Sequence, residues 1–110
     1  MTRFHFQKLD AYVVAKEVAV LVHRAQIRDL ELRDQATRAA KSCFLNLSEG
    51  LPSKQSGIRR RHFASALGSL GELCAALDLA AAIGVVDESA DLDAALSRLA
   101  PLVGGLLRAA

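Results

Sequence analysis

Residues 63–81 read FASALGSLGELCAALDLAA, and this stretch decides the fold. Its larger side chains recur at alternating spacings of four and three residues, as on the packed face of an α-helix; they are Phe63, Leu67, Leu70, Cys74, Leu77 and Ala81. A parallel row of small residues is shifted by one position and holds Ala64, Gly68, Gly71, Ala75 and Ala82. A glycine inside a helix costs about 1 kcal/mol relative to alanine. We therefore expect another helix to approach closely along Gly68 and Gly71, unless the row is only the composition of an alanine-rich helix.

The same reading extends in both directions along the chain. The pattern predicts a helix over about 58–83, which Gly84 ends, and further helices over about 8–26, 34–50 and 89–109. Asp34 is the predicted N-cap of the second helix. Gly50 and Pro52 stop that helix. Pro101 should kink the fourth helix, because proline lacks the backbone N–H and clashes with the preceding turn.

The first predicted helix carries more apolar surface than one bundle needs. A broad arc fits a core-facing stripe and contains Ala11, Val14, Ala15, Val18, Leu21 and Val22. A second, narrower stripe holds Val13, Val20 and Ile27 at strict seven-residue spacing. Contiguous exposed apolar surface usually marks association. We therefore expect Val13, Val20 and Ile27, together with Gly68 and Gly71, to lie at an interface between copies of the chain.

Length and composition favour one all-helical domain over residues 1–110. Of these residues 52% are hydrophobic but only 5% aromatic, so the core must consist of Leu, Val, Ile and Ala. Short connectors make consecutive helices antiparallel neighbours. The predicted fold is an all-α, up-down-up-down antiparallel four-helix bundle that forms homo-oligomers.

Charge is distributed unevenly along the chain. Residues 1–62 hold twelve Lys/Arg and six Asp/Glu, whereas residues 63–110 hold two and six. The basic half can attract phosphates, or it can meet the acidic half of a neighbouring helix or subunit. The densest cation cluster is Lys54 with Arg59, Arg60 and Arg61, and Arg38 and Lys41 extend it. These six residues are the candidate nucleic-acid contacts; the alternative is a solvated or intersubunit cluster.

The sequence gives little support to catalysis. Cys43 and Cys74 fall inside predicted helices and are expected to be buried thiols, and His5, His23 and His62 are far apart, so no metal site is expected. Ser48 and Ser69 lack a nucleophile motif, and no phosphate-binding glycine loop is present. We expect no enzyme activity, cofactor or small-molecule substrate. No apolar leader or membrane-spanning run is apparent, so the expected location is the cytoplasm.

Two segments carry a family resemblance over almost the whole chain. Arg38-Ala39-Ala40-Lys41-Ser42 leads to Asn46-Leu47-Ser48-Glu49-Gly50, and Phe63 precedes Ala66-Leu67-Gly68-Ser69-Leu70-Gly71-Glu72-Leu73. With the opening Phe6-Gln7-Lys8-Leu9-Asp10-Ala11-Tyr12, these resemble the bacterial four-helix-bundle family that includes ribosomal-RNA intervening-sequence proteins. The accessory variability protein of diversity-generating retroelements belongs to the same family. Tyr12 stands where that family commonly has tryptophan.

The resemblance implies a bundle that assembles into a ring-like homopentamer. Its best-understood member looks like a scaffold that binds RNA and a reverse transcriptase through a basic surface. Asn46, Glu49 and Glu72 fall on recurrent polar positions of the family. Because polar groups within a bundle fix helix register, we expect structural roles for these three residues, with Glu49 or Glu72 facing Arg38.

Two functional hypotheses follow. The first is a non-enzymatic homo-oligomeric scaffold that contacts RNA, DNA or a nucleic-acid enzyme through the basic surface. The alternative is a protein-only assembly module whose basic cluster is neutralised by the acidic 87–93 segment of a neighbouring subunit, without nucleic-acid binding.

Overall fold

Four α-helices and one short 3₁₀ turn make up the computed structural model, which describes residues 4–110. The turn η1 (His5–Lys8) precedes α1 (Asp10–Arg24), α2 (Leu30–Gly50), α3 (Ser56–Ala82) and α4 (Ala90–Ala109). All four predicted helices are confirmed within a few residues at each end. The start of α2 is the exception, since Asp34 is not its N-cap. The side chain of Asp29 accepts a hydrogen bond from the Leu32 amide at 2.9 Å and begins the helix four residues earlier.

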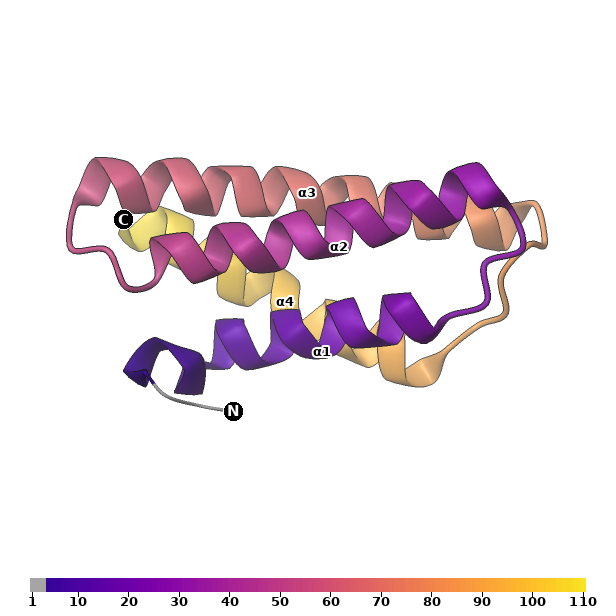
Figure 1. The fold of residues 1–110 in the computed structure, drawn as a ribbon, viewed down its shortest axis with the longest axis horizontal. Coiled ribbons are helices and arrows are strands. Elements are labelled where there is room, and N and C mark those ends of the chain that lie inside the picture. The colour runs from indigo at the N-terminus through magenta and orange to yellow at the C-terminus, as the bar shows by residue number, and fades with distance from the viewer. Residues whose placement is uncertain (1–3) are drawn as a thin grey trace.

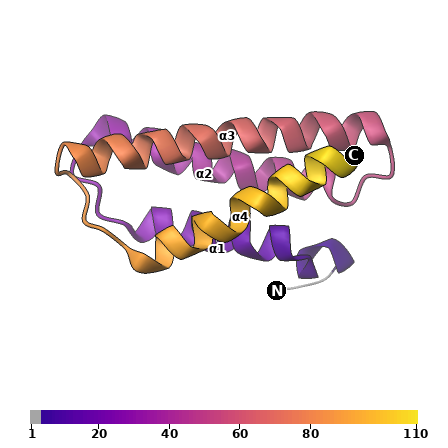
Figure 2. The ribbon, with the colours of Figure 1, turned by 180° about the vertical axis from the view of Figure 1, so that it is seen from behind.

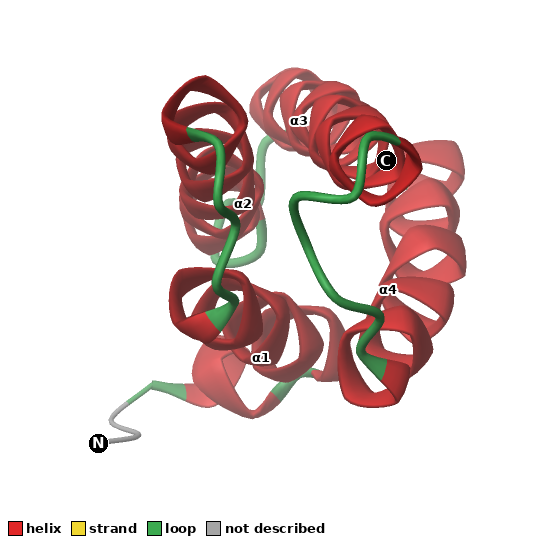
Figure 3. Ribbon diagram, turned by 90° about the vertical axis from the view of Figure 1, so that its right-hand side faces the viewer, coloured by secondary structure: helices red, strands yellow, loops and turns green. Residues whose placement is uncertain are grey.

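The helices alternate in direction and surround one core. Figures 1 and 2 show α2 and α3 side by side, with α1 and α4 on the other side of the bundle. Seen end-on in Figure 3, each helix lies beside its two neighbours, with α4 diagonally opposite α2. The antiparallel four-helix bundle predicted from the sequence is therefore confirmed. Of all the helix pairs, α2 and α3 have the most extensive contact.

The core-facing side of α3 differs from the prediction. Phe63 and Leu70 are buried, but Leu67, Cys74 and Ala81 are exposed. The row that faces the bundle instead contains Phe63, Ala66, Leu70, Leu73, Ala76 and Ala80. Alanines on this row meet the buried alanines of α2, which are Ala36, Ala39 and Ala40. Small residues let the two helices approach closely, so the close packing expected along Gly68 and Gly71 occurs on this neighbouring face.

The glycine row of α3 points away from the rest of the chain. A Cβ atom added at Gly68 or Gly71 would meet no atom within 4 Å. Length and composition alone would also allow α3 to span a membrane, although the core helix of a soluble bundle passes the same test. In the structure one face of α3 packs on the core, while much of its apolar surface remains uncovered.

The apolar arc of α1 is confirmed, but its second stripe is shorter than predicted. Val13 and Val20 are 45% and 39% exposed, whereas Ile27 is only 2% exposed and belongs to the core. The prediction that Ile27 lies at an interface is wrong, because α1 ends at Arg24 and the chain then turns inward. Seven-residue spacing keeps residues on one face only while the helix continues.

The end of the bundle that holds the α1–α2 and α3–α4 connectors is fixed by specific backbone features. Gly84 ends α3 with a φ of 79°, a left-handed conformation that favours glycine. The following residue, Val85, accepts a hydrogen bond from the Arg28 amide at 2.7 Å, which joins the α1–α2 and α3–α4 connectors. In the α3–α4 connector, Ser89 begins α4 by accepting from the Leu92 amide at 3.2 Å. The helix α4 then continues through Pro101 to Ala109.

Candidate nucleic-acid interface

Arg59 is bound to the protein itself. Its Nη1 atom donates to the carbonyl oxygens of Gly50, Leu51 and Ser53 at 3.2, 3.0 and 3.1 Å. The guanidinium lies over the ring of Phe63, 5.0 Å from the ring centroid. The last carbonyl groups of a helix have no partner within the helix, so Arg59 caps the C-terminal end of α2. This contact holds the start of α3 against the end of α2.

The other cations of the predicted cluster face outward. Lys54 and Arg61 are exposed, and Arg60 donates from Nη2 to the Ala110 carbonyl oxygen at 3.1 Å. Successive helix positions point around the circumference, so the three arginines separate into different directions. The structure therefore leaves Lys54, Arg60 and Arg61 as an exposed basic surface at one end of the bundle, which we call the end patch.

A polar network joins α2 to α3 next to this end. His62 Nδ1 lies 3.1 Å from Asn46 Oδ1, and His62 Nε2 lies 3.2 Å from Glu49 Oε2. Asn46 Nδ2 donates to the Ser42 carbonyl at 2.9 Å, which orients its oxygen toward His62. Asn46 and Glu49 thus link helices, although the partner of Glu49 is His62 and not Arg38. Arg38 Nε donates to the Asp34 carbonyl, and Glu72, exposed on α3, lines one hollow together with Arg38, as predicted for one of the two glutamates.

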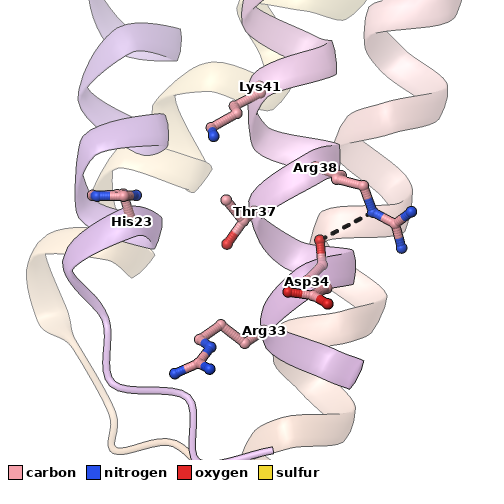
Figure 4. Close-up of a pocket in the computed structure, with 6 residues that line it drawn as sticks. All are labelled: His23, Arg33, Asp34, Thr37, Arg38 and Lys41. Atoms are coloured by element: carbon pink, nitrogen blue, oxygen red, sulfur yellow. Dashed lines mark hydrogen bonds between the residues drawn. The ribbon is translucent and has the colours of Figure 1, made fainter. Parts of the chain in front are cut away.

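A second basic surface lies in an open cleft of about 490 Å³ along α1 and α2. Arg38 and Lys41, both predicted from the sequence, meet residues that the prediction omitted; the cleft is lined by His23, Arg33, Asp34, Thr37, Arg38 and Lys41. Figure 4 shows His23 on α1 and the other five side chains on α2. Asp34 contributes one negative charge among the cations. We call this surface the α1–α2 cleft.

The missing members of the cleft had a weak signal in the sequence. Thr37 and Lys41 follow Arg33 at four-residue steps, which places all three on one side of α2. His23 joins them only because α1 and α2 are antiparallel neighbours, so the end of α1 lies beside the start of α2. The two basic surfaces are separated along α2, since Lys41 and Gly50 are about 14 Å apart at 1.5 Å per helical residue.

The two cysteines have different surroundings. Cys43 is buried, as predicted, but Cys74 is exposed because it lies outside the core-facing row of α3. Burial raises the pKa of the Cys43 thiol to about 12, and the charge of nearby Cys74 adds to that shift. Desolvation also raises the pKa of Cys74. Neither thiol is activated as a nucleophile, because activation requires a lowered pKa.

Fold and surface together define a class of protein, an all-α bundle with cations concentrated along α2 and at the start of α3. Among residues 4–110, no group of three His, Cys, Asp or Glu side chains is placed to hold a metal ion. The model of the 23S rRNA-intervening sequence protein family matches residues 7–105, and the chain belongs to this family. No curated protein matches the sequence.

Proposed function

We propose that the protein is a non-enzymatic, cytoplasmic homo-oligomeric scaffold that contacts nucleic acid, or an enzyme acting on nucleic acid, through its basic surfaces. The observation that carries the proposal is the clustering of exposed cations in the α1–α2 cleft and the end patch. Guanidinium and ammonium groups pair with phosphate oxygens without reading base sequence. Arg59 is left out of the contact surface, because its guanidinium already binds three backbone carbonyls.

Self-association is supported by the apolar surface that the single chain leaves uncovered. The outer side of α3 exposes Leu67, Leu79 and Ile83 beside the open Gly68–Gly71 row, and α1 exposes Val13 and Val20. A second copy is the simplest cover for these surfaces. The ring-like homopentamer implied by the family resemblance is part of the proposal.

Solution mass tests both parts of the proposal. Light scattering of the chain alone should give an oligomer, and a short structured RNA should add mass at low salt and less mass at moderate salt. The double reversal Arg38→Glu with Lys41→Glu should abolish the RNA gain and leave the oligomer unchanged. Arg98→Glu is the matched control for each single reversal, because it changes the net charge equally and lies on α4, diagonally across the bundle from α2.

Two results would overturn the proposal. A monomer would show that the exposed surfaces of α1 and α3 are not covered by a second copy. An oligomer that gains no mass with RNA at low salt would refute the nucleic-acid part of the proposal, and the protein would then be an assembly module.

One observation favours that second candidate, a protein-only module. A hollow of about 280 Å³ between α3 and α4 has an apolar floor, including Leu77 and Leu92, and a rim that carries Asp78, Asp87, Glu88 and Asp93. This acidic rim is complementary to the end patch of a neighbouring subunit. If the protein is such a module, its oligomer should dissociate as salt rises and should have no affinity for RNA.

A further inference from the structure

Four of the five aromatic residues lie together at the surface. The chain has four phenylalanines and one tyrosine, and only Phe63 is fully buried in the core. Phe4 and Phe6 are stacked with centroids 6.0 Å apart, and Phe6 meets Tyr12 edge-on at 5.7 Å. Tyr12 in turn packs on Phe44 of α2 at 4.9 Å. These four rings, which we call the aromatic row, connect η1 to both α1 and α2.

The outermost ring of the row is open to solvent. Phe4 is 62% exposed, while its ring lies within 15° of parallel to that of Phe6. The Phe4 amide donates to Gln7 Oε1 at 2.9 Å, which ties its backbone to the η1 turn. A large aromatic side chain is thus presented to solvent at a defined position and is not buried in the core.

The aromatic row continues directly into the α1–α2 cleft. On α1, Tyr12, Lys16 and His23 share one side of the helix at spacings of four and seven residues. On α2, Phe44, Lys41 and Arg33 follow in the opposite direction, because the helices are antiparallel (Figure 1). The contact between Tyr12 and Phe44 fixes this register at one end, and the shared lining by His23 and Arg33 fixes it at the other.

The basic side chains of the α1–α2 cleft therefore begin next to the last two rings of the aromatic row, Tyr12 and Phe44. Lys16 Nζ lies 5.9 Å from the centroid of Tyr12, and Lys41 is three residues from Phe44 on α2. The distance along α1 from Tyr12 to His23 is about 17 Å at 1.5 Å per residue. One surface of this length presents aromatic rings at one end and positive charge along the rest.

We infer that this surface binds a single strand of nucleic acid, with its phosphates along the α1–α2 cleft and an unpaired base stacked on Phe4. The inference rests on the proposed function and specifies its ligand. Proteins that bind single strands combine a positively charged groove with aromatic side chains on which bases stack. In a duplex the base faces are already stacked on one another, so an exposed ring gains nothing from a paired base.

Two probes of equal length separate the contribution of bases from that of phosphates. One is a short oligouridylate and the other is an abasic oligonucleotide with the same number of phosphates, each carrying an end label. Fluorescence anisotropy at low salt measures the dissociation constants for the full chain. Stacking contributes about 1–3 kcal/mol per base, so one stacked base should make oligouridylate bind at least about 5-fold more tightly than the abasic probe.

Three variants test the assignment of residues. Phe4→Ala should remove the preference for oligouridylate and leave the abasic affinity unchanged, and Phe4→Trp should restore the preference. Lys41→Glu should raise the dissociation constants of both probes by the same factor. Phe4 is outside the core, and a circular dichroism melt of each variant checks that the bundle is intact.

The possible failures are distinguishable. Equal affinity of the wild-type chain for both probes, or a preference that survives in Phe4→Ala, would overturn the stacking inference while RNA binding by the scaffold stands. Equal affinity for a duplex that carries the same number of phosphates would also overturn it. Binding of neither probe nor duplex at low salt would overturn the nucleic-acid part of the proposed function and the inference together.

Discussion

Replacing Arg59 by alanine is expected to destabilise the bundle far more than replacing its neighbour Arg61. Hydrogen bonds from charged groups contribute about 1.5–3 kcal/mol each. The three carbonyls that Arg59 binds share one nitrogen with two protons, and the side chain is half-buried. We therefore take about 2 kcal/mol for the whole set, including the contact with Phe63. Loss of this amount lowers the Tm of a domain of this size by roughly 8–12 °C.

The assay is thermal unfolding followed by circular dichroism, at one protein concentration because oligomers melt in a concentration-dependent way. Arg61→Ala removes the same charge from an exposed position and should change the stability by less than about 0.5 kcal/mol. Arg59→Lys should be intermediate, since an ammonium group cannot reproduce the planar guanidinium contacts. If Arg59→Ala and Arg61→Ala melt within about 2 °C of each other, Arg59 does not cap α2, and its guanidinium is again a candidate nucleic-acid contact.

Three further predictions concern glycine packing and the thiols. Gly50→Ala should lower the free energy of unfolding in urea by about 1–3 kcal/mol, because the new Cβ would lie 2.7 Å from Phe63 Cε1. The control Gly57→Ala, whose new Cβ meets no atom within 4 Å, should be neutral or stabilising. Equal effects of the two variants would contradict the packing of Gly50 on Phe63. A thiol-specific reagent at mild alkaline pH should label Cys74 in the native chain, whereas Cys43 should be labelled only after unfolding. Rapid labelling of both thiols in the native chain would refute the burial of Cys43. Because the pKa of Cys43 is raised to about 12 and an unfolded thiol titrates near 8.5, its stabilising contribution should be complete below about pH 8.5 and fall by up to about 1.4 kcal/mol per pH unit above it. The pH series of urea unfolding should therefore be flatter for Cys43→Ala, and an unchanged slope would exclude Cys43 as the cause.

Helix positions followed from the sequence because alternating four- and three-residue spacing is a local property. The face that α3 turns to the core did not follow, since two adjacent apolar rows have the same spacing. Only packing against the alanines of α2 selects the row that contains Ala66 and Leu73. Ile27 was misplaced for a different reason: the seven-residue stripe was continued to Ile27 although the predicted helix already ended near residue 26, and α1 in fact ends at Arg24.

The candidate site was predictable in part. Arg38 and Lys41 were identified from the sequence, but their combination with His23 and Arg33 depends on the neighbouring helix. Arg59, Arg60 and Arg61 are chemically identical in the sequence, and their roles separate only when the connector after Gly50 folds back toward Arg59. A run of identical residues predicts local charge, but it does not predict which of them binds the protein's own backbone.

The close pairing of α2 and α3 has a consequence for the order of folding. These helices are consecutive in the chain and share the Ser69–Ser42, His62–Asn46 and Arg59–Gly50 hydrogen bonds. Contacts between consecutive helices close short loops and so form early. We expect the α2–α3 hairpin to be the folding nucleus, onto which α1 and α4 then dock. Native-state hydrogen exchange should accordingly find the slowest amides in α2 and α3, whose opening approaches the global unfolding free energy.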